Sequence, residues 1–401
     1  MVAENERWDR LRRRLWQPPR PHGEQPQERA VGPLELFYDL VVVVLVAQAA
    51  DHLAGQPTWR GLAEFAAVFT LIWIAWLNGS LYHDLHGRED ARGRTVLLVQ
   101  ILALVPLGAF VPQAGGTRGA EFAVDAAVLF VILAVFWRLA GRGTGPEYRR
   151  TGLLFVAGTV ACAAALAATA LLPADVRVTA WLLLDACYLV GFGIMIGTAR
   201  PVLTITAALI ERFGAFIIIV LGETVTGVVA GLVHEPTGAL TIAVGLIAVV
   251  IGFGAWWTYF DFVGHRPPRP TRAATVQWIL THLPLTAAVT AMGAAMPGLV
   301  EHAHDRSSPA PIAWLLCAGT AVALGSAMVL AASLQAWRQN RHLYRPLAGT
   351  CVAVAALCLA LAALRPAPLL LGLALVLLIS VPWVVAVARH LTADDPTEEL
   401  H

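Results

Sequence analysis

The sequence predicts an all-α fold, a polytopic transmembrane helical bundle of about twelve spans, on three observations. Hydrophobic residues make up 58% of the 401 residues and charged residues only 14%, whereas soluble domains average about 25% charged residues. The apolar residues gather in runs of about 20, the length of helix that crosses a hydrocarbon core about 30 Å thick. Two of these runs begin with similar charged motifs, which favours an internal repeat.

The spans follow from the positions of the apolar runs and of the polar loops between them. The last two are separated only by Arg365-Pro366-Ala-Pro368. The twelve predicted spans are residues 34–54, 59–83, 94–112, 119–139, 152–172, 177–197, 205–232, 237–263, 273–298, 310–333, 346–364 and 367–388.

Arginine asymmetry predicts the orientation of these spans. If the N-terminus lies inside, the cytoplasmic loops carry fourteen arginines and the opposite loops five, as expected where basic residues are retained inside. Residues 1–30 are polar and rich in arginine and proline, which indicates a cytoplasmic tail, and 391–401 form a second one. The sequence therefore predicts a multi-pass protein of the bacterial inner (plasma) membrane with both termini cytoplasmic.

Two stretches of the chain resemble each other at an offset of about 180 residues. When Glu211 is aligned with Glu35, Phe213 falls on Phe37, and the ends of the second and eighth spans are also similar. We therefore predict two six-helix transmembrane repeats, over 31–200 and 201–390. Six is an even number, so the repeats would run parallel about an axis along the membrane normal. Chance similarity between apolar helices is the alternative.

The first and seventh spans carry the charged residues that the prediction of function rests on. Glu35 and Asp39 are four residues apart, so they share one helical face. Ionisable groups at membrane depth are costly and usually face the protein interior or a water-filled cavity. Arg212 needs a carboxylate partner, and Glu35 and Asp39 are preferred over Glu211 and Glu223. The structural alternative is that these buried pairs only fix the register of the helices. The predicted substrate or ion pathway comprises Glu35, Asp39, Gln48, Asp51, Glu211, Arg212 and Glu223.

Further polar and aromatic residues lie at the ends of the second and eighth spans. His83, Asp84 and Asp261 are candidates to line a cytoplasmic vestibule. His83 and Asp84, with His86 and Asp90, could also suggest a metal or phosphotransfer site, for which a solvated loop is the preferred interpretation. An aromatic belt at the membrane interface is the expected role of Trp73, Trp76, Tyr82, Trp256, Trp257 and Tyr259. Other polar points inside spans are Gln100, Asp125, Asp185 and His282.

Several functions are not expected from this sequence. The net charge is near zero, which argues against a nucleic-acid partner. The chain has no lysine for a Walker motif, and no G-x-S-x-G, HExxH or CxxC motif. The five cysteines fall in apolar runs and are expected to be small core residues. We therefore expect no enzyme activity, no cofactor and no metal.

These residues together resemble the bacterial low temperature requirement protein A (LtrA) family. The resemblance is carried by Pro33-Leu-Glu-Leu-Phe-Tyr-Asp-Leu40, by Glu211-Arg-Phe-Gly with Ile219-Val-Leu-Gly-Glu223, and by Trp256-Trp-x-Tyr-x-Asp261. It covers about residues 31–390. The resemblance implies a multi-pass membrane protein linked by name to growth in the cold, and it implies no particular reaction.

The stretch Glu35-x-Phe-Tyr-Asp39 is also similar to the E-x-F-S-D motif that opens each six-helix repeat of a family of non-canonical potassium channels. Here Tyr38 replaces the serine, and the second copy has Gly214-Ala215 in place of Ser-Asp. This similarity implies the same two-repeat architecture.

Three functional hypotheses follow from these observations. The leading one is a proton- or cation-coupled transporter with a buried carboxylate and arginine site. The second is a passive cation channel on the same fold. The third is a membrane enzyme or lipid-binding protein with its site at the cytoplasmic face, which predicts a lipid-sized groove near His83, Asp84 and Asp261. The partners expected are the lipid bilayer, an unknown small ion or solute, and a further copy of the chain in a homo-oligomer.

Overall fold

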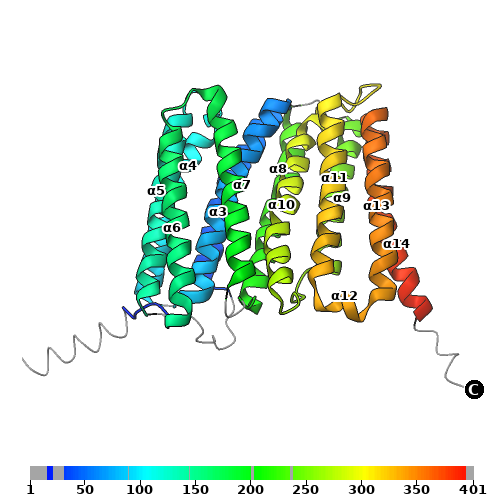
Figure 1. Cartoon of the computed structure of the whole chain (residues 1–401). Helices are drawn as coiled ribbons and strands as arrows, with labels where there is room; N and C mark the ends of the chain where they lie inside the picture. The colour runs from blue at the N-terminus through cyan, green and yellow to red at the C-terminus, as the bar shows by residue number, and fades with distance from the viewer. Residues whose placement is uncertain are drawn as a thin grey trace, which may run out of the picture. The chain divides into compact units, whose positions relative to one another are not determined.

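The computed structural model describes residues 16–20, 31–88, 90–143, 145–199, 203–234 and 238–393. Long helices joined by short connections make up this part of the chain (Figure 1). Two short 3-10 helices, Val111–Gln113 and Gly141–Gly143, extend the ends of α4 and α5. The helices are α2 Pro33–Gly55, α3 Trp59–His86, α4 Ala91–Phe110, α5 Gly119–Ala140, α6 Pro146–Thr169, α7 Ala174–Thr198, α8 Ala207–His234, α9 Ala239–Phe262, α10 Arg272–Glu301, α11 Ala310–Ser333, α12 Gln335–Gln339, α13 Arg341–Leu364 and α14 Pro368–Ala393.

Twelve helices of the described chain are long and apolar enough to cross a membrane, which confirms the predicted all-α transmembrane fold. They are every α-helix given above except the five-residue α12. The boundary between the last two is also confirmed, because α13 ends at Leu364 and α14 begins at Pro368. Arg365 adopts a left-handed conformation there, and the two prolines that follow cannot continue the helix.

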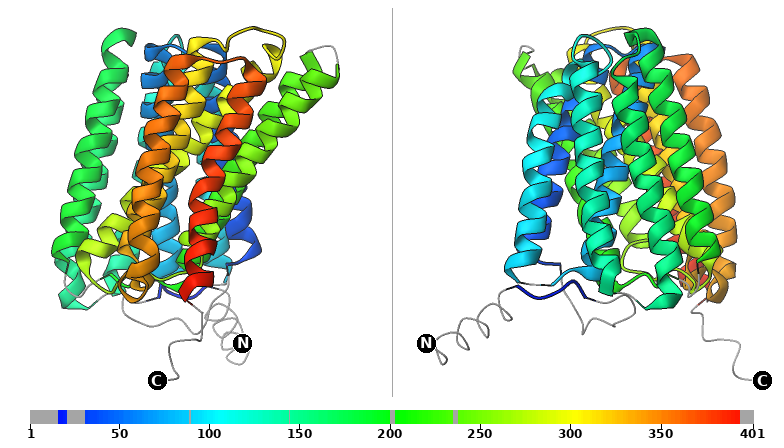
Figure 2. Two further views of the ribbon diagram at one scale, coloured as in Figure 1. Left: turned by 90° about the vertical axis from the view of Figure 1, so that its right-hand side faces the viewer. Right: turned by 60° about the vertical axis from the view of Figure 1, so that its left-hand side comes forward.

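One compact unit consists of residues 1–49, 62–215 and 270–276. Within it α4, α5, α6 and α7 pack against one another in chain order, as short connections between antiparallel helices require (Figure 2). Aromatic pairs join these helices: the Phe122 and Trp181 ring centroids are 5.1 Å apart, and those of Trp137 and Phe155 are 4.6 Å apart. This unit also contains the first part of α2, the start of α8 and most of α3.

The second compact unit consists of residues 50–61, 216–269 and 277–401. In it α11 packs on α13, α14 packs on both α9 and α13, and α9 also contacts α11. Its core is built from small and branched apolar side chains, among them Ala248, Met296, Leu316, Cys358 and Leu375. The units follow packing rather than chain order, and the two-repeat arrangement over 31–200 and 201–390 stays a prediction.

The predicted aromatic belt is wrong for α3. Trp73, Trp76 and Tyr82 are at most 4% exposed, and Tyr259 of α9 is buried as well. The reason is that α3 is the most enclosed of the twelve spans, so its aromatic residues have no interface to occupy. Only Trp256 and Trp257 of the predicted set keep more than a third of their surface exposed.

Candidate functional site

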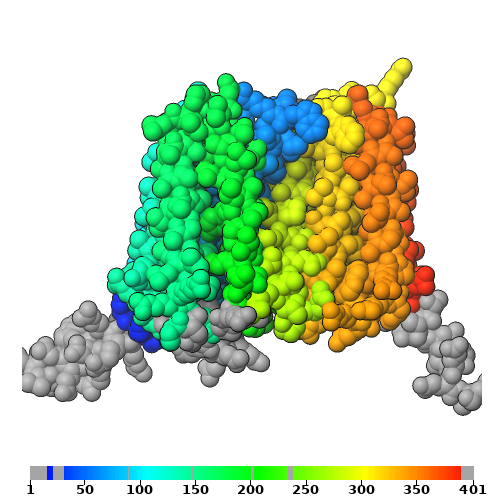
Figure 3. Space-filling model, in the orientation of Figure 1, coloured from blue at the N-terminus to red at the C-terminus, as the bar shows by residue number. Residues whose placement is uncertain are grey.

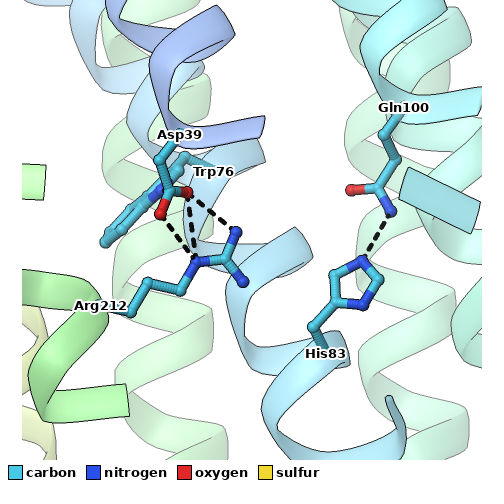
Figure 4. Close-up of polar contacts among 5 residues, drawn as sticks. All are labelled: Asp39, Trp76, His83, Gln100 and Arg212. Carbon is cyan, nitrogen blue, oxygen red and sulfur yellow. Dashed lines mark hydrogen bonds and ion pairs between the residues drawn. The ribbon is translucent and has the colours of Figure 1, made fainter. Parts of the chain in front are cut away.

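Asp39 of α2 and Arg212 of α8 form a buried ion pair within the first unit (Figure 4). The Arg212 Nη2 atom donates to Asp39 Oδ1 over 2.9 Å, and Nε is 3.2 Å from each carboxylate oxygen. Asp39 is 0% and Arg212 2% exposed. The structure thus selects Asp39 from the two preferred partners of Arg212. Removing one member of such a pair leaves an uncompensated buried charge, which costs about 3–5 kcal/mol.

The local sequence of α2 explains why Asp39 faces inward. Tyr38, Val42, Leu45 and Val46 are buried with it, at the three- and four-residue spacing of one helical face. Leu36, Phe37, Leu40 and Val44 are exposed on the other side, where an apolar side chain can face lipid. Asp39 is therefore carried to the interior by the packing of its apolar neighbours.

Aromatic side chains enclose the ion pair. The Trp76 Nε1 atom donates a 2.7 Å hydrogen bond to Asp39 Oδ1. The Trp76 ring also meets the Phe213 ring edge-on, with centroids 4.9 Å apart. On the other side the Arg212 guanidinium lies 5.4 Å from the centre of the Tyr38 ring, within the range of a cation–π interaction. These rings pack around a pair that is already hydrogen-bonded on several atoms.

A second polar group lies beside the pair, where α2, α3 and α4 meet at Gly79. A Cβ on Gly79 would be 2.6 Å from Gln100 Oε1 and 2.8 Å from the Tyr38 hydroxyl, so only glycine permits this approach. The amide nitrogen of Gln100 donates to His83 Nε2 over 3.4 Å (Figure 4). Tyr38, Gln100 and His83 therefore follow the ion pair as a line of buried polar side chains, with no hydrogen bond between the Tyr38 hydroxyl and Gln100 Oε1.

Three atoms in this set have no hydrogen-bond partner among the described residues: the Tyr38 hydroxyl, Gln100 Oε1 and Arg212 Nη1. Buried polar atoms are nearly always hydrogen-bonded, because an unmade bond costs about 1–3 kcal/mol. Each of these atoms offers a donor or an acceptor to a water molecule, a proton or a small solute.

The end of α3 continues the polar set. Asp84 accepts a hydrogen bond from Thr206, whose hydroxyl also accepts from the Leu209 amide at the start of α8. The Arg20 guanidinium donates to the Asp84 backbone carbonyl, and the Arg20 carbonyl oxygen lies 2.8 Å from His86 Nδ1. Residues 16–20 therefore cover the end of α3 where His83 and Asp84 lie.

The remaining predicted pathway residues of this unit have different environments. Glu35 is buried on the inner face of α2, one turn before Asp39. Gln48 is partly exposed, and Glu211 is exposed and accepts a weak 3.4 Å hydrogen bond from the Val31 amide. Glu211, which precedes Arg212 in the sequence, is thus not the residue that pairs with it.

In the second unit the structure brings Asp51 and Glu223 close enough to interact electrostatically. Glu223 accepts a 3.3 Å hydrogen bond from Thr226, and Asp51 is exposed. Asp261, the third predicted vestibule residue, is exposed and accepts a hydrogen bond from Trp383 Nε1 over 3.0 Å. His83 and Asp84 belong to the first unit and are buried.

Sequence reasoning missed the roles of Trp76, Tyr38 and Gly79. A tryptophan near a span end is typical of an interface, and a single glycine in an apolar helix carries no signal of its own. The signal that could have found Trp76 is its position inside a span, since a buried indole nitrogen needs an acceptor. No group of three or more His, Cys, Asp or Glu residues suited to a metal ion occurs in the described part of the chain.

Comparison with known proteins adds to this geometry. The sequence matches the family model described as "Bacterial low temperature requirement A protein (LtrA)" over residues 30–385. It is similar to an uncharacterized protein, RA0937, of Rhizobium meliloti (strain 1021), with 26% identity over 284 residues. That match covers 65% of this chain and 67% of the relative. The helices that supply the ion pair, α2 and α8, both lie within the range matched by the family model.

Proposed function

The chain belongs to the bacterial low temperature requirement A (LtrA) family, and from this premise we propose that it is a proton-coupled membrane transporter. Its twelve candidate spans make it an integral membrane protein. The observation that supports transport is the line of buried polar groups from the Asp39–Arg212 pair through Tyr38 and Gln100 to His83.

Protons fit this line better than free metal cations do. Carboxyl, phenol and imidazole groups can each bind and release a proton, and the unpartnered Tyr38 and Gln100 oxygens can order the water that passes it on. The fixed positive charge of Arg212 repels a bare cation at the same place. A passive cation channel predicts ohmic currents that are independent of the pH gradient, whereas a proton-coupled transporter predicts saturable flux that depends on it.

The Asp39–Arg212 pair is proposed as the gate of this line. While the carboxylate is ionised, three hydrogen bonds from Arg212 and one from Trp76 hold it closed. Protonation of Asp39 removes its negative charge and weakens all four, because charge-assisted hydrogen bonds are about twice as strong as neutral ones. Arg212 is then free to turn toward other acceptors, and the carboxyl carries the proton.

We propose that Asp51 and Glu223 of the second unit form a further proton- or cation-binding site. Their mutual repulsion and the partial burial of Glu223 favour the binding of a positive charge. Glu35, Gln48 and Glu211 of the first unit are assigned to the pathway beside the Asp39–Arg212 pair on their positions along α2 and α8. Neutralising Glu223 by Glu223→Gln tests the site in the second unit, since unchanged flux would show that Glu223 takes no part in transport.

We propose that both termini face the cytoplasm, because the loops on that side carry fourteen arginines against five. The Asp84 end of α3, covered by residues 16–20, then lies on the cytoplasmic side. A periplasm-dependent reporter enzyme fused to either terminus is expected to be inactive, and activity at one end would reverse the assignment.

Transport is proposed rather than catalysis because the paired groups lie inside a bundle of spans, between rings that hold them in one geometry. The hypothesis of an enzyme or lipid site at the cytoplasmic face would place the reacting groups around His83, Asp84 and Asp261. His83 and Asp84 are instead enclosed by α3, α4 and residues 16–20.

Removal of the Tyr38 hydroxyl oxygen tests the proposal with little risk to folding. In proteoliposomes containing a trapped pH-sensitive dye, Tyr38→Phe is expected to lower proton flux about tenfold, the equivalent of about 1.4 kcal/mol for the lost hydrogen bond to the water that this hydroxyl is proposed to order. The phenyl ring keeps its place beside Arg212, so the ion pair remains.

Tyr259→Phe is the matched control, because Tyr259 is equally buried in the second unit and its hydroxyl contacts His282 Nε2 over 3.1 Å. Its flux should equal that of the unaltered protein. Equal flux in Tyr38→Phe and Tyr259→Phe would contradict a pathway through Tyr38.

A further inference from the structure

A long apolar cavity of about 550 Å³ lies between α6 and α7 within the first unit. Figure 3 shows this face of the molecule hollowed between the two helices. Its walls extend along α6 from Thr151 to Ala165, which is about 21 Å of helix axis. A smaller cavity of about 90 Å³ adjoins it, since Thr151, Phe155, Phe192 and Met195 line both.

Three hydroxyl groups in the walls of the cavity already donate hydrogen bonds within the protein. Thr159 donates to the Phe155 carbonyl, Tyr188 donates to Asn78 Oδ1, and Thr198 donates to the Ile194 carbonyl. The rest of the lining is dominated by apolar side chains and glycine. A polar solute would find few partners here, whereas a hydrocarbon chain would lose none.

The length of the cavity matches its setting in a membrane. About 21 Å is more than half of a hydrocarbon core about 30 Å thick, so the cavity is long enough for the acyl chain of a lipid from one leaflet. Cys187, which the sequence suggested was a core residue, is exposed and lines the cavity instead. Cys187 is exposed because the space between α6 and α7 leaves one side of α7 uncovered.

Positive charge lies at one end of this cavity. Arg149 and Arg150 precede Thr151 in the first turns of α6, and both are exposed and make no hydrogen bond or ion pair with other described residues. No side chain caps the N-terminus of α6, where the helix dipole also favours an anion. Clusters of arginine at the membrane surface attract anionic lipid headgroups.

We propose that the cavity between α6 and α7 is a binding site for one anionic phospholipid, with an acyl chain between the helices and the phosphate at Arg149 and Arg150. This site is separate from the line of polar groups proposed for proton transport. It accounts for the apolar lining, for the length of the cavity and for the two exposed arginines at its end.

Two glycines allow the cavity to be filled without a clash. Gly158 of α6 and Gly191 of α7 line it, and a Cβ on either would meet nothing within 4 Å. Gly158→Leu and Gly191→Leu are therefore expected to fold and to occupy the space of the chain. Gly325→Leu is the matched control, since Gly325 also faces open space, on α11 of the second unit and outside this cavity.

The test uses the full-length protein in proteoliposomes that contain phosphatidylglycerol with a photoactivatable group in its acyl chain. We expect crosslinks to residues of the cavity, loss of these crosslinks in Gly158→Leu and Gly191→Leu, and their retention in Gly325→Leu. Unlabelled phosphatidylglycerol should compete better than phosphatidylcholine, and Arg149→Gln with Arg150→Gln should remove that preference.

Three results would overturn the proposal. Undiminished crosslinking in both leucine variants would place the lipid elsewhere. Equal competition by phosphatidylcholine would show that the cavity holds bulk lipid without headgroup recognition. A change of oligomeric state in the leucine variants, with no cavity crosslinks in the unaltered protein, would show that a second copy of the chain covers the cavity.

Discussion

At the scale of single residues, the proposed proton pathway centres on the Asp39 carboxylate and the donors that hold it. The sequence predicted that Arg212 would find a carboxylate on α2, because a buried arginine needs one. It could not predict the indole donor, since the distance from Asp39 to Trp76 depends on how α2 packs on α3. The hydrogen bond between them is 2.7 Å long.

The contribution of the Trp76 hydrogen bond to stability can be separated from the contribution of the size of the side chain. Trp76→Phe and Trp73→Phe remove the same atoms from neighbouring buried positions of α3. Trp73 Nε1 has no partner among the described residues, so only Trp76→Phe loses a hydrogen bond. Because a bond to a charged group contributes about 1.5–3 kcal/mol, we expect Trp76→Phe to lower the free energy of unfolding in detergent by about 2 kcal/mol more. Equal losses in the two variants would show that the indole does not stabilise the carboxylate.

At the scale of helices, small residues decide which neighbours can approach. The sequence contains Gly193-x-x-x-Gly197 and Gly227-x-x-x-Gly231, a pattern that permits close contact between helices. Only the second is confirmed as a contact: a Cβ on Gly227 would lie 2.7 Å from the Gly293 carbonyl oxygen of α10, whereas one on Gly197 would meet nothing. The motif in α8 thus packs closely while Gly197 of the α7 motif faces open space, because the effect of the motif depends on the helix opposite.

A pair of substitutions on α8 tests this close approach. Gly227→Val would force a methyl group against the backbone of α10, while at Gly222 of the same helix a Cβ meets nothing within 4 Å. Overpacking of this kind costs about 1–3 kcal/mol, so we expect Gly227→Val to lower the midpoint of thermal unfolding and Gly222→Val to change it little. A similar midpoint for both variants would mean that α8 and α10 separate at no cost.

At the scale of the whole molecule, the twelve spans were predictable because length and hydropathy are properties of the sequence alone. The boundaries differ from those of the structure by a few residues, for example at 34–54 against Pro33–Gly55. The cavity between α6 and α7 was not predictable, since its lining residues are ordinary apolar residues whose separation arises only from packing. The same limit applies to Gly79, where three helices bring Tyr38 and Gln100 to one point.

The central claim is that protons cross the membrane through the polar line beside the Asp39–Arg212 pair. Substitution of Gln100 tests this claim most directly. Gln100→Leu keeps a side chain of similar size but removes both the oxygen near Tyr38 and the nitrogen that donates to His83. Gln277→Leu is the control, since the Gln277 amide donates to the Val329 carbonyl in the second unit.

The decisive measurement is dye-reported proton flux in proteoliposomes under an imposed pH gradient. The account predicts that Gln100→Leu abolishes flux while Gln277→Leu retains that of the unaltered protein. Flux through Gln100→Leu that matches the control would contradict it.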